Sequence, residues 1–165
     1  MNRKGQEEII GFVLIMVVVA VVALILLGLS VRNQNTGTRE SNELYQFLQS
    51  SSEFTTDCKI RNTEYARIQD LFGLCLDNGA CLNGLDSCDV LLKDMRGLID
   101  ASWNIGNESQ VRGYLFVSSY EAGVEASLEE IIRLEEGDCA GARVGSSYLI
   151  PEFPGRIANI FHVCY

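Results

Sequence analysis

The feature that most constrains this chain is an uninterrupted apolar run near its N-terminus. Residues Ile9 to Leu29 include no charged side chain and nothing more polar than glycine, and the next charge is Arg32. A helix of this length spans about 30 Å, the thickness of the hydrocarbon core of a bilayer. The run is apolar on all sides, and a chain of 165 residues is too small to bury such a helix completely. The sequence therefore predicts one transmembrane helix.

Charge is distributed as unevenly as hydrophobicity. Arg3 and Lys4 balance Glu7 and Glu8, so the segment up to residue 31 is neutral and the rest of the chain carries the whole formal charge of −9. An acidic domain repels phosphate backbones, which makes nucleic acid an unfavourable partner. An acidic surface also keeps a domain soluble, and we prefer this interpretation.

All six cysteines follow the apolar run, and their even number predicts three disulfides. They are Cys58, Cys75, Cys81, Cys88, Cys139 and Cys164. Disulfides persist in oxidising compartments, so the domain that carries them is expected outside the cell. A cytosolic zinc site is the alternative, but such sites usually contain CxxC pairs, and none is present here. Six cysteines can form 15 different sets of three disulfides, and the sequence does not select one of these sets. It suggests a single pair, Cys139 with Cys164, whose bridge would fix the last strand in place.

The N-terminal residues MNRKGQEE resemble the class III signal peptides of archaeal type IV pilin-like proteins. The matching residues are Lys4 at the basic position, Gly5 as the small residue before the cut, and Gln6 as the first mature residue. The resemblance covers about the first 30 residues, and it implies a prepilin-peptidase-like enzyme as a processing partner. It also implies that the apolar helix stays on the mature protein.

In such a protein the apolar helices of many subunits form the core of a filament. Glu7 or Glu8 could then pair with the α-amine of an adjacent subunit, a contact that low dielectric strengthens. Many family members have glutamate at the fifth mature position, whereas this chain has Ile10. An uncleaved signal anchor needs the same apolar run and remains the alternative.

The remaining sequence predicts helices first and strands later. Residues 33–39 are polar and include a glycine, as in a hinge. Three apolar helical faces follow. Their residues are, in turn, Leu44, Phe47, Leu48 and Ser51; Tyr65, Ile68, Leu71, Phe72 and Cys75; and Cys88, Leu91, Leu92, Met95, Leu98, Ile99 and Trp103. Asp86 is expected to cap the third helix. Strands are expected at 114–120, 131–134, 146–150 and 157–165, while the segment 125–136 is equally compatible with a helix.

These elements predict an α+β fold. A long N-terminal hydrophobic helix is expected before a small disulfide-bonded domain of helices packed on an antiparallel sheet. The expected division is a leader at 1–5, a transmembrane or filament-core helix at 6–32, a hinge at 33–39 and an extracellular head at 40–165.

No residue pattern predicts catalysis, and no cofactor or metal is expected. His162 is the single histidine; it shares a strand face with Ile160 and Cys164, which favours a structural role. The acidic residues Glu135, Glu136 and Asp138 could bind calcium, although a solvated turn is the more usual role of such a cluster. Asn107 begins a glycosylation sequon.

Two functions of different kinds therefore remain open. One is a structural subunit of an extracellular surface filament, which assembles with identical subunits and serves adhesion at the cell surface. The other is a membrane-anchored extracellular binding module that does not polymerise. An exported hydrolase that uses paired acids would need a deep cleft with convergent carboxylates. We accordingly expect a protein of the cell membrane and cell surface that is not an enzyme.

Overall fold

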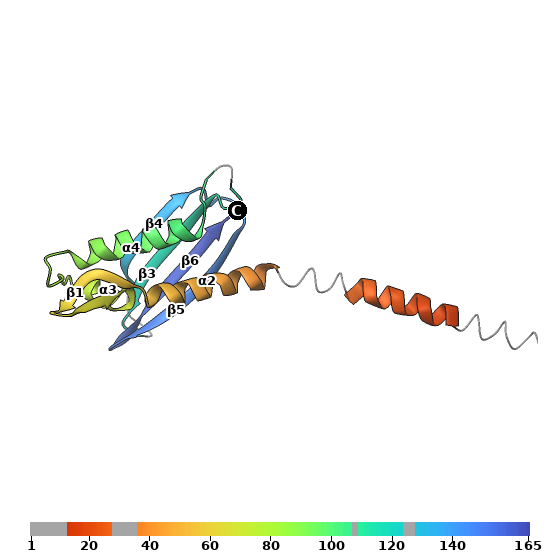
Figure 1. The fold of residues 1–165 in the computed structure, drawn as a ribbon, viewed down its shortest axis with the longest axis horizontal. Helices are drawn as coiled ribbons and strands as arrows, with labels where there is room; N and C mark the ends of the chain where they lie inside the picture. Colours follow the sequence, from red (N-terminus) through yellow and green to blue (C-terminus); the bar gives the residue numbers. More distant parts are fainter. Residues whose placement is uncertain (1–12, 28–35, 107–108, 124–127) are drawn as a thin grey trace, which may run out of the picture. The chain divides into compact units, whose positions relative to one another are not determined.

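A computed structural model describes residues 13–27, 36–106, 109–123 and 128–165. The chain divides into two compact units between Arg39 and Glu40 (Figure 1). The residues predicted to direct processing and charge pairing (Lys4, Gly5, Gln6, Glu7 and Glu8) lie outside the described residues, as does Asn107.

The prediction of a long N-terminal hydrophobic helix is wrong for the residues that the structure describes, while the predicted bounds 6–32 extend beyond those residues at both ends. The described helix covers residues 13–27, and its length of about 22 Å falls short of the roughly 30 Å of a bilayer core. No helix among the described residues is long and apolar enough to cross a membrane. An unbroken apolar run shows where polar groups are missing, and it does not by itself establish the length of a helix.

The head contains three helices and six strands in its described residues. In chain order they are α2 (Thr36–Ser52), β1 (Thr55–Arg61), β2 (Glu64–Arg67), α3 (Ile68–Leu76), α4 (Ser87–Ser102), β3 (Gly113–Glu121), β4 (Leu128–Gly137), β5 (Arg143–Glu152) and β6 (Gly155–Cys164). Residues 36–39, expected in the hinge, form the first turn of α2.

The larger sheet has the strand order β4-β3-β6-β5, and each neighbouring pair is antiparallel. Helices α2 and α4 cross one face of it (Figure 1). Strand side chains alternate between two faces. On β6 the residues facing the helices are therefore Ile157, Asn159, Phe161 and Val163, and all four are buried.

An aromatic cluster fills the space between this sheet and the helices. Phe161 has no exposed surface, and its ring lies 5.5 Å from Phe47 of α2 and 5.1 Å from Trp103 at the end of α4, centroid to centroid. Tyr114 and Phe116 of β3 lie 6.2 and 6.3 Å from the same ring. These spacings are typical of packed aromatic side chains. Phe161 is therefore the residue at which both helices and the sheet meet.

The sequence correctly placed α4 and its cap. The Asp86 side chain accepts hydrogen bonds from the backbone N–H groups of Cys88 and Asp89, which satisfies two groups that the first helical turn leaves open. The α2 face is also as expected, with Leu44 and Leu48 buried.

A small hairpin of β1 and β2 lies between α2 and α3, where helices alone were expected. Tyr65 belongs to β2 and is 46 % exposed, so its assignment to a helical face is wrong. The ambiguous segment 125–136 forms the strand β4 from Leu128 onward. In both places the chain pairs with a neighbouring strand, a tertiary contact that local periodicity does not record.

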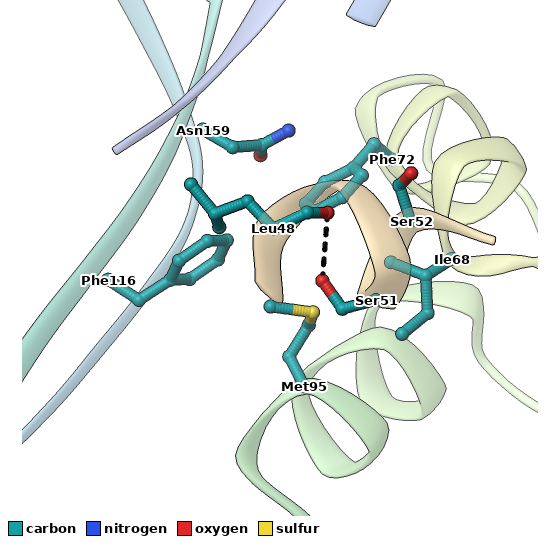
Figure 2. Close-up of a pocket in the computed structure, with 8 residues that line it drawn as sticks. All are labelled: Leu48, Ser51, Ser52, Ile68, Phe72, Met95, Phe116 and Asn159. Atoms are coloured by element: carbon teal, nitrogen blue, oxygen red, sulfur yellow. Dashed lines mark hydrogen bonds between the residues drawn. The ribbon is translucent and has the colours of Figure 1, made fainter. Parts of the chain in front are cut away.

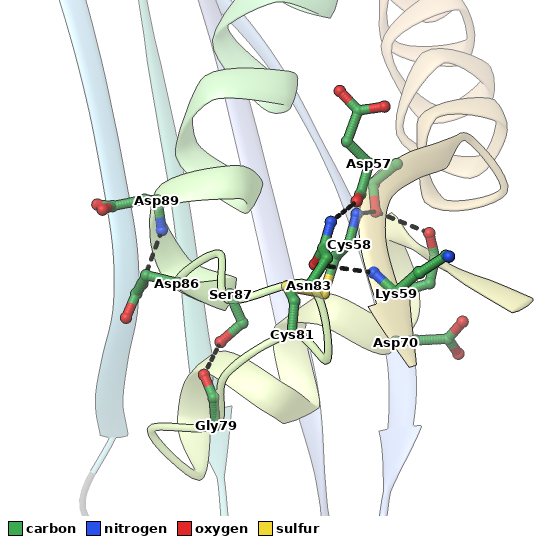
Figure 3. The surroundings of a disulfide bond; sticks show 12 residues. Asp57, Cys58, Lys59, Asp70, Gly79, Cys81, Asn83, Asp86, Ser87 and Asp89 are labelled. Atoms are coloured by element: carbon green, nitrogen blue, oxygen red, sulfur yellow. Dashed lines mark hydrogen bonds between the residues drawn. A yellow bond between two sulfur atoms is a disulfide. The ribbon is translucent and has the colours of Figure 1, made fainter. Parts of the chain in front are cut away.

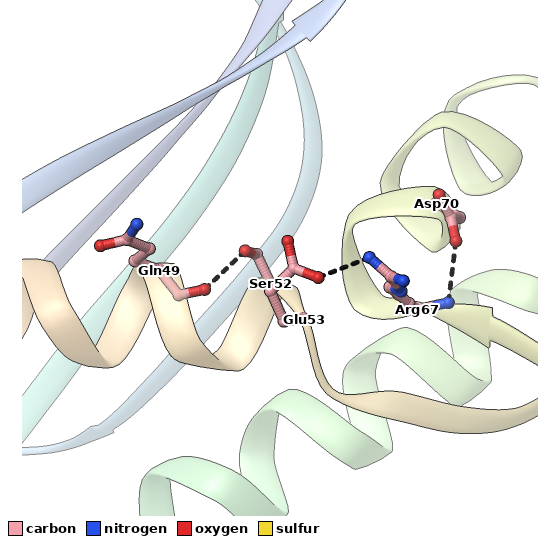
Figure 4. Close-up of polar contacts among 5 residues, drawn as sticks. All are labelled: Gln49, Ser52, Glu53, Arg67 and Asp70. Atoms are coloured by element: carbon pink, nitrogen blue, oxygen red, sulfur yellow. Dashed lines mark hydrogen bonds and ion pairs between the residues drawn. The ribbon is translucent and has the colours of Figure 1, made fainter.

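Arg67 connects the end of α2 with the start of α3. Its guanidinium lies 2.6 Å from the Glu53 carboxylate, and its backbone N–H donates to the Asp70 side chain at 2.9 Å (Figure 4). Nearby, the Ser52 hydroxyl donates to the Gln49 carbonyl at 2.7 Å. The ion pair is half-exposed, so we assign it a positioning role rather than a large contribution to stability.

Candidate functional site

The cysteines form three disulfides: Cys58–Cys81, Cys75–Cys88 and Cys139–Cys164. The predicted disulfides and the favoured pair Cys139–Cys164 are thus confirmed. None of the cysteines is free, so this domain offers no thiol for nucleophilic or redox chemistry.

The Cys58–Cys81 disulfide attaches the loop 77–86 to strand β1 (Figure 3). The Asn83 side chain supports the same attachment, because its amide donates to the Asp57 carbonyl at 2.8 Å. On the far side of the loop, the Ser87 hydroxyl donates to the Gly79 carbonyl at 2.6 Å. Asn83 and Gly79 of this loop therefore have structural roles.

A gap in the core lies between α2, α3, α4 and the sheet (Figure 2). Its lining is mostly apolar and leaves no room even for a water molecule. The Ser51 hydroxyl in its wall donates to the Leu48 carbonyl at 3.0 Å, whereas the Asn159 side-chain oxygen has no hydrogen-bond partner among the described residues. This gap is a packing defect and cannot admit a ligand.

The acidic residues singled out for calcium lie at the end of β4 and in the turn after it. Glu135 and Glu136 are neighbours on a strand, so their side chains point to opposite faces. The Asp138 carboxylate accepts from the backbone N–H of Ala140 at 2.9 Å. Among the residues described, no three acidic, histidine or cysteine side chains are grouped as metal ligands.

His162 lies on the face of the larger sheet opposite the aromatic cluster. A shallow, open hollow there is lined by Arg143, Gly145, Ser146, Ser147, Ile160 and His162. The imidazole covers Gly145 on the adjacent strand so closely that a side chain at that position would collide with it. Its Nδ1 atom is buried without a hydrogen-bond partner among the described residues. The other residues of this hollow were not predicted from the sequence, although the alternation along 143–152 could have placed several of them on one face.

Burial, and secondarily the Arg143 guanidinium, lowers the pKa of His162 below its ordinary value of 6.5. The unfolded chain therefore binds this proton more readily than the folded chain does, and folding stability should fall as the pH drops through 6.5 and below. We expect His162→Asn to reduce this pH dependence. Urea unfolding of the full chain at several pH values between 5 and 8 would measure it, and identical profiles for both proteins would contradict the expectation.

The helix of residues 13–27 is the most unusual surface among the described parts of the chain. Thirteen of its large apolar side chains are between 49 % and 68 % exposed, Val13 and Leu27 among them. Soluble monomers rarely expose a continuous apolar surface of this extent, and such surfaces commonly mark an interaction site. Water solvates this helix poorly, so another apolar surface must cover it.

Comparison with protein-family models, curated proteins and solved structures found no match to this chain.

Proposed function

We propose that this protein is a structural subunit of an extracellular surface filament, held to identical subunits through its apolar N-terminal segment. The observation that carries the proposal is the exposure of the helix of residues 13–27 on all its sides. A helix with one apolar face could be covered by one partner, whereas this helix needs apolar neighbours all round. Copies of the same helix supply such neighbours.

The head domain fits a structural role outside the cell. Three disulfides tie a domain of this size together, and such crosslinks are stable where the surroundings are oxidising. Two of its pockets are a closed core gap and an open hollow. Lys4, Gly5 and Gln6 resemble a prepilin-peptidase site, and cleavage there would make Gln6 the N-terminus of the mature protein.

The test uses the full chain expressed in a host that carries a prepilin peptidase. Surface material sheared from the cells should contain filaments in electron micrographs, and N-terminal sequencing of that material should begin at Gln6. Purified subunits should also polymerise when detergent is diluted. Val18→Glu places a charge in the middle of the exposed apolar helix, and we expect it to abolish polymerisation because that charge would be buried without a partner.

Val18→Leu is the matched control, and it should polymerise as the unchanged protein does. An exported protein that keeps Met1 and stays a small particle after detergent dilution would refute the proposal. That result would instead support the membrane-anchored binding module.

A further inference from the structure

The edge of strand β5 has backbone groups free for another strand. Strand β5 pairs with β6 alone among the described strands. The Tyr165 N–H donates to the Ala142 carbonyl at 2.8 Å, and backbone groups of successive strand residues point to alternate sides. By this alternation Val144, Ser146, Tyr148 and Ile150 face β6, while Gly145, Ser147 and Leu149 face away from it.

Two details of β5 agree with this geometry. The Gly145 carbonyl, which faces the edge, accepts a hydrogen bond from the Ser41 hydroxyl of α2 at 3.1 Å. Pro151 also falls in the outward-facing set, where its missing N–H removes no bond to β6. The part of the edge left open is therefore centred on Ser147 and Leu149.

The opposite edge of the sheet is β4, and it differs strongly in charge. Its exposed side chains include Glu129, Glu130, Glu135 and Glu136, against the single cation Arg133. Strand β5, in contrast, has no charge between Arg143 and Glu152. Two β4 edges would repel each other because like charges would lie opposite one another. A β4 edge can meet a β5 edge without this repulsion.

Strand direction also favours pairing of unlike edges. In four antiparallel strands the two edge strands run in opposite directions. The β5 strand of one copy and the β4 strand of an identically oriented copy are thus antiparallel where they meet. A contact of this kind joins two different surfaces and can repeat from subunit to subunit in one direction.

We propose that β4 of a second copy of this chain pairs with the β5 edge, which extends the sheet from subunit to subunit. This pairing has one feature in common with the proposed function, on which it rests to that extent: the partner is an identical subunit. The contact itself is separate from the apolar helix.

The side chains match in one register. On β3, the alternate residues Leu115, Val117, Ser119 and Glu121 lie opposite Glu135, Arg133, Glu130 and Leu128 of β4, with a bulge between the second and third pairs. The same spacing on β5 places Arg143 opposite Glu135 and Leu149 opposite Leu128. These pairs join opposite charges and two exposed leucines, which are 47 % and 67 % exposed.

In the middle of this register, two small residues of β5 lie opposite two long charged residues of β4. Gly145 and Ser147 would lie opposite Arg133 and Glu130, whose side chains form an ion pair at 2.8 Å. Because glycine and serine have no long side chain, neither residue competes with the partners of that ion pair. Cross-strand pairs of these kinds each favour association modestly, and their effects combine along the strand.

The first experiment reverses the terminal charge pair in the full chain, kept in detergent micelles so that the apolar helix is covered. Sedimentation velocity at rising protein concentration should show association of the unchanged protein. Arg143→Glu and Glu135→Arg should each weaken it about tenfold, as expected for one reversed charge pair at an interface. The double variant should recover association, because the opposite charges again face each other. Arg61→Glu and Glu64→Arg reverse an exposed ion pair of the β1–β2 hairpin and should leave association unchanged.

Amide hydrogen exchange on the unchanged protein gives a second readout that needs no variant. The outward-facing N–H groups of Ser147 and Leu149 on β5, and that of Glu130 opposite Ser147 on β4, should exchange more slowly as concentration rises. Slowing on β5 alone, with no effect of Glu135→Arg, would indicate pairing of two β5 strands and overturn the proposal. Absence of association in micelles would overturn it too, and would leave the filament proposal intact, since polymerisation is tested after detergent removal.

Discussion

Phe161→Ala is expected to lower the free energy of unfolding by about 3–5 kcal/mol, as truncation of a buried phenylalanine typically does. Phe161 has no exposed surface and touches aromatic rings from α2, β3 and the end of α4. Its removal would leave a cavity that rigid neighbouring rings cannot close. Guanidinium unfolding of the full chain, followed by Trp103 fluorescence, would measure the loss. Trp103 is the single tryptophan, and its ring centroid lies 5.1 Å from that of Phe161, so its signal reports on this cluster directly.

Ile160→Ala is the matched control on the neighbouring residue. Ile160 points to the other face of the sheet and is 39 % exposed. Its truncation should cost about 1 kcal/mol, because little buried surface is lost and no cavity forms. Equal losses for the two variants would show that the aromatic cluster is not the centre of the core.

Removal of the Cys58–Cys81 disulfide by the double change Cys58→Ala and Cys81→Ala is expected to cost about 3.5 kcal/mol. The bridge closes a loop with a sequence separation of 23 residues, and its loss gives the unfolded chain more freedom. Both cysteines are buried, at 0 % and 5 % exposure. Denaturant unfolding of the unchanged and the double-alanine proteins, with the other two disulfides oxidised, would give the difference.

Asn83→Ala provides the comparison for this disulfide, since Asn83 attaches the same loop to β1 by hydrogen bonds alone. We expect a loss of about 1 kcal/mol. If Asn83→Ala cost as much as removal of the disulfide, the loop would be held mainly by its hydrogen bonds. The bridge would then have no special role in the stability of the head.

Local patterns were sufficient for several parts of the head. The helix face at Leu44 and Leu48, the Asp86 cap of α4 and the strand at residues 114–120 each depend on residues close together in sequence. An even set of six cysteines was also enough to predict disulfides. In these cases the residues that carry the pattern also make the contacts that stabilise the element.

Other parts depended on how separate segments of the chain pair with one another. The β1–β2 hairpin was missed because Tyr65 fits a helical spacing with Ile68 and Phe72, whereas its strand is stabilised by pairing with β1. The pairs Cys58–Cys81 and Cys75–Cys88 could not be chosen among the possible combinations. The hollow around His162 requires β5 and β6 to be adjacent, which no local pattern states.

By itself, the sequence determined the apolar character of the N-terminal segment, the acidity of the head and the presence of disulfides, because these properties belong to side chains whatever their surroundings. The tertiary structure alone decided the strand order β4-β3-β6-β5 and the contrast between its two edges. Which strands become neighbours depends on the balance between many weak contacts distributed over the whole chain. Such a balance exists only once the chain has folded.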